Sequence, residues 1–435
     1  MKPELCENIS VNGAGHLCFA GQDVTALGKR FGTPLYLMDE ERIRFNCRQY
    51  REAFSRCFSP ASGVLFASKA CAFRQMYRIV QEEGLGADVV SRGEIYTAVS
   101  AGMDMSRVYF HGNSKTDADI LYAMEQHVGY IVAENEEEVE ALERLAAERG
   151  MKQAILLRLT PGIDPHTYEA ISTGKVDTKF GTAIETGQAK ELIAYTLKQP
   201  HVELAGYHCH VGSQVFGEDV FEQTVQVMLE FAAEIKAELG YSPAQLNLGG
   251  GYGVRYVDTD PFLSIPEKIA SVAEVFHACC DRLGLAEPAI FMEPGRSIVA
   301  DAGMTVYTVG AVKRIPGYKA YVSVDGGMAD NPRFALYGAR YTCYAAGKMH
   351  EEAGERFTVA GCCCESGDLI QENVWLPESI CRGDCLAVAT TGAYNYSMAS
   401  NYNRLPRPAV VMLKDGGAYV AVKRESLEDL TRLDQ

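Results

Sequence analysis

Residues 64–71, VLFASKAC, join a short apolar run to a serine, a lysine and small residues that open a helix. The run VLFA has the composition of a buried strand. Lys69 stands in the turn after that strand, where Gly, Asn or Asp would be usual. The other strands of the chain indicate why a lysine is placed there.

Seven further apolar runs follow, and helical stretches with apolar residues every three or four positions separate them. Their apolar residues are continuous rather than alternating, which suits a parallel sheet buried on both faces. Eight strands that alternate with helices predict an α/β fold, a TIM-like (β/α)8 barrel. The expected strands are residues 64–67, 87–90, 107–110, 130–133, 154–159, 203–209, 245–248 and 289–292.

The alternation stops after Pro294. Strand-like runs such as MTVYTVGAV, KAYVSV and CLAVAT follow without long helices between them, which predicts an all-β C-terminal domain. The short N-terminal runs HLCFAG and PLYLMD are expected to complete this domain. We therefore expect joining strands in residues 1–35, the barrel in 36–298 and the β domain in 299–435.

Composition limits the possible partners and the cell compartment. The chain has 435 residues, 47% of them apolar, and a net charge of −16, so nucleic acid is an unsuitable partner because its binding needs clustered Lys and Arg. No signal-peptide core or membrane span is visible, which favours a cytoplasmic protein without a membrane partner. The 14 scattered cysteines lack metal-type or disulfide spacing and are expected to be reduced.

The residues that follow the strands are the candidates for chemistry, because barrel active sites lie at the C-terminal ends of strands. Each has an ordinary structural explanation: a surface lysine, a pair of strand histidines, a tight glycine turn and a salt-bridged EPGR turn. Together, an amine, a glycine turn with an arginine, a flat imidazole and an acid are the parts of a pyridoxal phosphate site. His208 and His210 share a strand face and could bind a metal, but without a third ligand we predict none.

A series of motifs then makes a resemblance specific. In this order they resemble the fold type III pyridoxal-phosphate decarboxylases, and within them the diaminopimelate decarboxylase family. The resemblance implies an alanine racemase-like architecture and pyridoxal 5'-phosphate as cofactor. It also implies decarboxylation of meso-2,6-diaminopimelate to L-lysine and CO2, the last step of lysine biosynthesis. The motifs are FASKA, ADVVSRGE, HGNSK, RLTPGIDPHTYEAISTGKVDTKFG, GYHCHVGSQ, LNLGGGYG, EPGRSIV, VDGGMADNPRFALYGARY, CESGD and GAYNYSMASNYN.

The resemblance implies roles for the residues around the cofactor. Lys69 matches the lysine that carries the cofactor, and His210 matches the residue stacked on its ring, which leaves His208 a structural role. Glu293 matches the acid beside the ring nitrogen. The implied cofactor contacts are completed by Ser213, Gly251, Pro294, Gly295, Arg296 and Tyr394.

The C-terminal part is expected to supply the substrate side. Arg333 and Tyr337 are four residues apart and would share a face of a helical turn, and a guanidinium with a phenol suits a carboxylate. The resemblance implies that they bind the substrate carboxylate together with Arg296, and that Tyr394 contacts substrate as well as cofactor. It also makes Cys364 the catalytic proton donor and Glu365 the partner of the distal ammonium, so that Cys362 and Cys363 are structural. The contacts of the stretch 161–181 are left unassigned.

Two alternatives stay open at this point. The first is a decarboxylase of another basic amino acid or of a carboxylated polyamine, of the ornithine, lysine or carboxynorspermidine type. The second is a non-catalytic homologue that binds pyridoxal phosphate, although Lys69, His210 and Cys364 together argue against it. The family resemblance also implies a homodimer with shared active sites.

Overall fold

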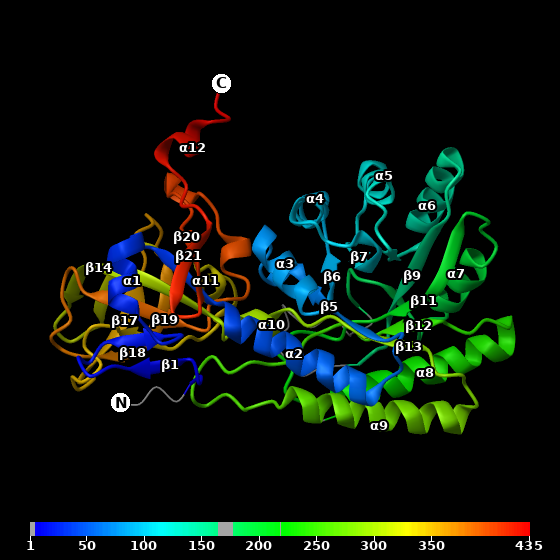
Figure 1. The fold of residues 1–435 in the computed structure, drawn as a ribbon, viewed down its shortest axis with the longest axis horizontal. Helices are drawn as coiled ribbons and strands as arrows, with labels where there is room; N and C mark the ends of the chain where they lie inside the picture. Colours follow the sequence, from blue (N-terminus) through cyan, green and yellow to red (C-terminus); the bar gives the residue numbers. More distant parts are fainter. Residues whose placement is uncertain (1–4, 164–176, 218) are drawn as a thin grey trace. The chain divides into compact units, whose positions relative to one another are not determined.

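A computed structural model describes residues 5–163, 177–217 and 219–435 (Figure 1). Within them the chain forms two compact units. The barrel unit consists of Asn46–Gly253 and Leu263–Gly295, and the β unit consists of Met1–Phe45, Val254–Phe262 and Arg296–Gln435. No helix in the described part of the chain is long and apolar enough to cross a membrane.

The barrel unit contains the eight expected strands, and they close on themselves. The order around the barrel is β9-β11-β12-β13-β5-β6-β7-β8, and a further pairing of β8 with β9 closes the ring. All of these pairings are parallel. The predicted barrel is therefore confirmed. Its strands are β5 (Gly63–Ala67), β6 (Gly86–Val89), β7 (Val108–Phe110), β8 (Tyr130–Ala133), β9 (Gln153–Thr160), β11 (Val202–His208), β12 (Gln245–Asn247) and β13 (Ala289–Met292).

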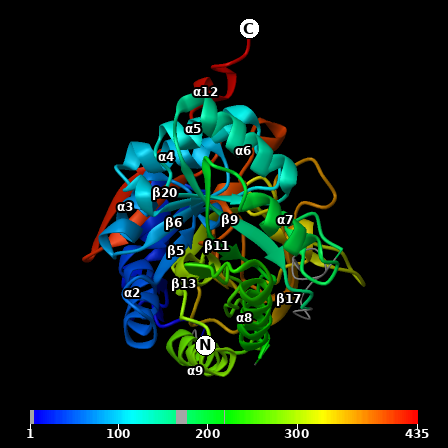
Figure 2. The ribbon, with the colours of Figure 1, turned by 90° about the vertical axis from the view of Figure 1, so that its right-hand side faces the viewer.

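Helices connect the strands and surround them, as Figure 2 shows for α3 to α8. Their ends follow local sequence signals: Asn135 caps the start of α6, and Gly150 ends it in a left-handed conformation, which glycine adopts without steric cost. The helices are α2 (Glu40–Cys57), α3 (Arg74–Glu82), α4 (Arg92–Ala101), α5 (Asp117–Glu125), α6 (Glu136–Arg149), α7 (Gln188–Thr196), α8 (Val220–Leu239) and α9 (Ile265–Leu283).

Apolar and aromatic side chains from several strands fill the barrel. Leu65, Tyr109, Val132 and Leu156 form one buried cluster. The Tyr109 hydroxyl donates to Gln245 Oε1 at 2.7 Å, so a strand on the other side of the closed sheet satisfies its polar end. The filled interior leaves the chemistry to the strand ends.

The β unit is organised around one long strand, β14 (Gly303–Arg314), which pairs with β4 (Leu35–Asp39), β15 (Ala320–Val324) and β19 (Cys385–Ala389). Strand β4 comes from the PLYLMD run near the N-terminus and also pairs with β20 (Ala409–Lys414). The remaining elements of this sheet are β16 (Cys343–Ala345), β17 (Glu355–Ala360), β18 (Leu369–Leu376) and β21 (Gly417–Val422).

The HLCFAG run lies in the β unit but outside its main sheet. It forms β2 (Leu17–Phe19) in a separate three-stranded sheet with β1 (Ile9–Val11) and β3 (Gln22–Asp23). Leu17 and Phe19 nevertheless pack in the same core as β14 and β20, and the Leu17 amide donates to the Ala346 carbonyl at 2.7 Å. Short strands with a buried face can thus join the core of a domain without extending its main sheet.

Candidate active site

Lys69 lies where β5 ends, in the short 3-10 turn Ser68–Ala70. Its side chain is exposed, while the flanking Ser68 is buried and donates from Oγ to Glu94 Oε2 at 2.8 Å. Glu94, in the first turn of α4, also accepts from the Val90 amide at 2.7 Å. These bonds hold the turn in place and leave the lysine at the surface of the barrel unit.

The turn after β13 packs directly against the Lys69 turn, because β5 and β13 are neighbours. The Ala67 amide donates to the Pro294 carbonyl at 3.1 Å. A Cβ on Gly295 would lie 2.9 Å from both the carbonyl oxygen and the Cβ of Ala67, so only glycine allows this approach. Within the barrel unit, Pro294 and Gly295 therefore lie beside the Lys69 turn.

The glycine turn after β12 is equally close-packed. Gly249 and Gly251 have φ values of +68° and +113°, which favour glycine. A Cβ on Gly250 would lie 2.1 Å from the Glu293 carbonyl oxygen, and one on Gly251 would lie 2.2 Å from the Gly212 carbonyl oxygen. The turn therefore presents backbone without side chains, the surface that lets N–H groups approach a phosphate.

His210 lies beside this turn and is half-buried. Its Nδ1 accepts a hydrogen bond from the Gly250 amide at 3.2 Å, so this nitrogen carries no proton. Burial lowers the pKa of His210 well below its usual value, and the positive charge of Lys69 acts in the same direction. His210 is thus a neutral, flat ring with a fixed tautomer, which suits stacking on another ring.

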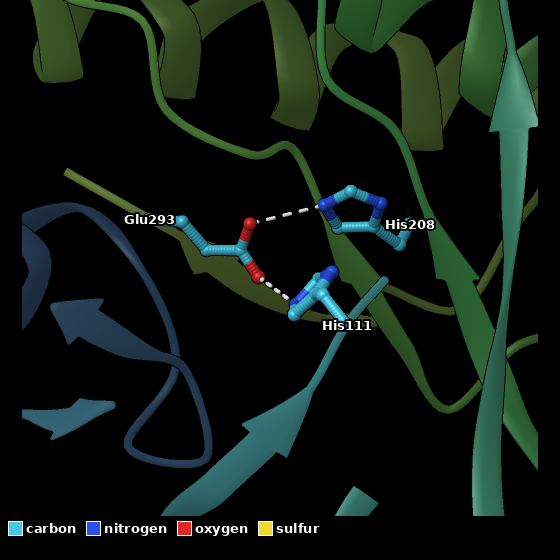
Figure 3. Close-up of side chains that lie close together, drawn as sticks. All are labelled: His111, His208 and Glu293. Atoms are coloured by element: carbon cyan, nitrogen blue, oxygen red, sulfur yellow. Dashed lines mark hydrogen bonds and ion pairs between the residues drawn. The ribbon is translucent and has the colours of Figure 1, made fainter. Parts of the chain in front are cut away.

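Glu293 follows β13 and is surrounded by donors from other strands (Figure 3). His208 Nε2 lies 3.0 Å from Glu293 Oε2, and His111 Nε2 lies 2.8 Å from Oε1. Asn247 Nδ2 also donates to Oε1, at 2.7 Å. All four side chains are buried. Burial alone would raise the pKa of Glu293, but His111 and His208 hold it well below its usual value.

A second group of aromatic and basic side chains lies within the β unit. Arg296 donates from Nη1 to the Tyr256 hydroxyl at 2.7 Å, and Arg333 donates from Nη1 to the Tyr341 hydroxyl at 2.7 Å. The Arg333 guanidinium also lies 4.8 Å from the Tyr256 ring centroid, and Arg296 lies 4.8 Å from that of Tyr394. We call these five residues the arginine–tyrosine cluster.

The charges of the two arginines dominate this cluster. Burial would raise the pKa of Tyr256, but Arg296 and Arg333 lower it below its usual value. Burial would lower the pKa of Arg333, but Tyr256 and Tyr341 raise it. Two buried guanidinium groups so close together attract an anion, and a planar carboxylate matches their geometry.

Arg333 and Tyr337 begin and end the short helix α11 (Arg333–Tyr337), as their spacing predicts. Their environments differ, however, because Arg333 is 7% exposed and Tyr337 is 38% exposed. Arg333 therefore belongs to the arginine–tyrosine cluster, whereas the structure shows no bond between it and Tyr337 in the described residues.

The CESGD loop carries Cys364 and Glu365 as exposed residues of the β unit. The Cys364 amide donates to Asn403 Oδ1 at 2.7 Å. Asp368 fixes the backbone of the loop, because its carboxylate accepts hydrogen bonds from the Cys363 and Met328 amides at 2.7 and 2.6 Å. The loop is thus fixed through its backbone while the side chains of Cys364 and Glu365 stay accessible. The stretch 161–181, whose contacts were left unassigned from the sequence, is described only in part, because residues 164–176 lie outside the described residues.

Five buried residues of this region were missed from the sequence, among them Asp88, whose Oδ1 lies 3.8 Å from His111 Nε2. His111 lies in the HGNSK motif after the third strand, and Asn247 ends the strand before the glycine turn, so their positions were a usable signal. Asp88 lies inside a strand, and Tyr256 and Tyr341 lie in irregular segments, where nothing in the pattern distinguishes them from core residues.

Comparison with known proteins agrees with this geometry. Residues 40–300 match the pyridoxal binding domain of the pyridoxal-dependent decarboxylases. The chain belongs to the pyridoxal-dependent decarboxylase family, and its cofactor is pyridoxal 5'-phosphate. The resemblance stated from the motifs is confirmed.

Individual relatives are more specific. The chain is 44% identical over 423 residues to the diaminopimelate decarboxylase of Bacillus subtilis, covering 97% of this chain and 96% of that protein. It is 43% identical to the diaminopimelate decarboxylase of Staphylococcus aureus, covering 97% of this chain and 98% of that protein. The crystal structure of diaminopimelate decarboxylase from M. jannaschii in co-complex with L-lysine superposes with a TM-score of 0.90. It is 32% identical and covers 99% of this chain and 98% of that chain.

The residues of the barrel unit fit the cofactor. A carboxylate offers about four acceptor positions, and the three contacts of Glu293 leave room for one further donor, such as a protonated ring nitrogen. The contacts with His111 and His208 keep Glu293 charged in spite of its burial. The side-chain-free glycine turn suits the phosphate, and Lys69 provides an accessible amine.

Proposed function

We propose that the protein is an enzyme that decarboxylates meso-2,6-diaminopimelate to L-lysine and CO2, the last step of lysine biosynthesis. The observation that carries this proposal is the 44% identity, over nearly the whole chain, to the Bacillus subtilis diaminopimelate decarboxylase. The arginine–tyrosine cluster supports it, because a second carboxylate distinguishes diaminopimelate from simpler basic amino acids.

The barrel residues would hold the cofactor. Lys69 would bind it covalently through Nζ, His210 would stack on its ring, and Glu293 would keep the ring nitrogen protonated. The bound cofactor supplies the electron sink for the pair released when CO2 leaves. The phosphate and the remaining contacts are assigned to Ser213, Gly251, Pro294, Gly295, Arg296 and Tyr394.

The residues of the β unit would handle the substrate. Arg296, Arg333 and Tyr337 would bind the distal carboxylate, Glu365 the distal ammonium, and Tyr394 both substrate and cofactor. Cys364 would deliver a proton from Sγ to the carbon that has lost its carboxylate. Ornithine has no distal carboxylate and would leave buried guanidinium groups without an anion, which is a costly mismatch.

We further propose that the protein is a cytoplasmic homodimer in which each active site uses residues of both subunits. We also propose that residues 36–298 bind the cofactor and that residues 299–435 supply substrate-binding residues. These proposals rest on the family resemblance.

The proposed activity is tested by incubating purified holoenzyme with meso-diaminopimelate and measuring lysine and CO2. We expect equal amounts of the two products, no product from a Lys69→Ala variant, and unchanged activity in a Lys190→Ala variant, whose half-buried lysine pairs with Glu234 and Glu238. A Lys69→Ala protein that kept both cofactor absorbance and activity would contradict the assignment.

A further inference from the structure

The cluster around Glu293 contains a residue to which neither the motifs nor the comparisons give a role (Figure 3). His111 follows β7 and points its Nε2 at Glu293 Oε1 from 2.8 Å. Its ring also meets the ring of His208 edge to face, with centroids 4.7 Å apart. His111 is only 5% exposed, so its ring is buried among other side chains.

A second carboxylate lies near the same ring nitrogen of His111. Asp88 Oδ1, from β6, lies 3.8 Å from His111 Nε2 and is itself buried. An imidazole beside two carboxylates is favoured in its charged form. Burial would lower the pKa of His111, but Glu293 and Asp88 raise it above its usual value, against a smaller opposing effect of Arg158.

The other members of the cluster cannot replace that positive charge. Burial lowers the pKa of His208 to about 4, so His208 donates a hydrogen bond but is neutral. Asn247 is also neutral. Burial and the charge of Glu293 raise the pKa of Asp88, in spite of His111 and Lys69, and a carboxyl group supplies no positive charge in either protonation state.

We propose that His111 is a positioning residue for the cofactor: an imidazolium that fixes the Glu293 carboxylate and compensates its charge inside the barrel unit. This inference rests on the proposed role of Glu293 beside the ring nitrogen. Without a neighbouring cation, a buried Glu293 would take up a proton. A neutral acid is a weaker partner for a protonated ring nitrogen than a carboxylate, so the cofactor would bind less tightly.

A metal site is the main competing explanation, since His111, His208 and Glu293 form a donor set that could hold an ion. His208 Nε2 forms a direct hydrogen bond to Glu293 Oε2 at 3.0 Å, and His111 Nε2 lies at ion-pair distance, 2.8 Å, from Oε1. The contact of Asn247 with Glu293 Oε1 uses a further acceptor position of the carboxylate. The direct nitrogen–oxygen contacts therefore favour a buried ion pair.

Two substitutions separate the charge of His111 from its N–H group. His111→Gln keeps an N–H donor without the charge, and His111→Phe removes both while keeping a flat ring. His201→Gln is the matched control, because His201 is a histidine of the barrel unit that contacts Glu143 at 2.7 Å outside the cluster.

The main readout is the dissociation constant of pyridoxal 5'-phosphate, measured by equilibrium dialysis with apoprotein at about pH 7. Loss of one partner of this buried ion pair predicts binding weakened roughly tenfold or more in His111→Phe. His111→Gln should be intermediate and the control unchanged. The kcat of the holoenzyme should fall in the His111 variants while the KM for diaminopimelate stays constant. Equal cofactor affinity in all four proteins would overturn the proposal.

A measurement on the unsubstituted protein keeps the test decisive if His111→Phe does not fold. Nitrogen NMR of the apoprotein at about pH 7 should show an imidazolium signal that is missing in His111→Gln. A neutral His111, or a tightly bound zinc ion that the His111 variants lose, would refute the assignment. If the unsubstituted protein bound cofactor but made no lysine from diaminopimelate, the proposed function would fail while the positioning role could still be read from cofactor affinity.

Discussion

Lys69 is exposed at the end of a buried strand. The residues proposed to bind the cofactor together with it follow the neighbouring strands of the barrel. The Ala67 amide bonds to the Pro294 carbonyl, and Gly295 allows the closest approach of the two turns. The glycine turn after β12 approaches Glu293 in the same way. The positions of these residues thus depend on backbone contacts between turns that the closed barrel brings together.

Cys364 is the residue to which we assign proton delivery. Replacement by alanine removes the donor and leaves the barrel residues intact, so cofactor absorbance should be unchanged while kcat falls about a hundredfold. Cys362→Ala, at the exposed cysteine two positions earlier, is the control and should retain activity. The measurement is CO2 release at saturating diaminopimelate. Wild-type kcat in Cys364→Ala would remove this role.

Tyr256 is expected to set substrate affinity because its hydroxyl accepts from Arg296 and its ring lies against Arg333. Tyr256→Phe keeps the ring but releases the Arg296 guanidinium, which costs about 1 kcal/mol. We expect the KM for diaminopimelate to rise roughly fivefold, in line with that figure, with unchanged cofactor affinity. Tyr318→Phe, at an 86% exposed tyrosine, is the control. An unchanged KM in Tyr256→Phe would show that the hydroxyl does not organise the arginines.

At the scale of elements, the barrel strands could be predicted within a residue or two because each is a continuous apolar run between turn residues. Strand β18, LIQENVWL, was missed because polar residues interrupt its apolar ones and Trp375 is exposed. Strand β16 has only three residues. Edge and short strands depend on partners far along the chain, which local patterns do not contain.

Helix α1 (Val24–Phe31) offers a prediction at this scale, because Asp23 caps it by accepting from the Thr25 and Ala26 amides. Burial opposes the Asp23 charge, but hydrogen bonds from Thr25 and His16 lower its pKa to about 2. A lowered carboxylate pKa stabilises the folded state above the usual pKa, and this contribution disappears as the pH falls toward 2.

Asp23→Ala should therefore destabilise the region of α1 by about 1 kcal/mol near neutral pH. The difference from the unsubstituted protein should shrink between about pH 4 and pH 2. Hydrogen exchange of the α1 amides in the full-length protein measures this locally. A difference that stayed constant over that pH range would contradict the role of the charge.

At the scale of the whole molecule, the order of segments in the sequence does not reveal which segments belong to the same unit. Residues Val254–Phe262 lie between two barrel strands in sequence but belong to the β unit. The Thr342 hydroxyl donates to the Tyr256 carbonyl at 2.9 Å and helps hold this segment there. Motif order could identify the family, but it could not predict that Tyr256 joins Arg296 and Arg333.

The proposed dimer with shared sites predicts complementation between inactive variants. In a mixed dimer of Lys69→Ala and Cys364→Ala subunits, one site would carry both substitutions and the other neither. Random mixing should then restore about a quarter of full activity, as expected for a twofold-symmetric dimer. The measurement is CO2 release after the two proteins are unfolded and refolded together. If co-refolding restores none of the activity that unsubstituted protein recovers under the same treatment, each site belongs to a single subunit.

The central claim, that the enzyme selects a substrate with a distal carboxylate, is tested most directly by kcat/KM for meso-diaminopimelate and for ornithine, measured by CO2 release from the same holoenzyme preparation. A buried site that leaves its charged groups unpaired with the wrong substrate predicts a preference for diaminopimelate of roughly ten-thousandfold. Turnover of ornithine at an equal or higher kcat/KM would contradict the account.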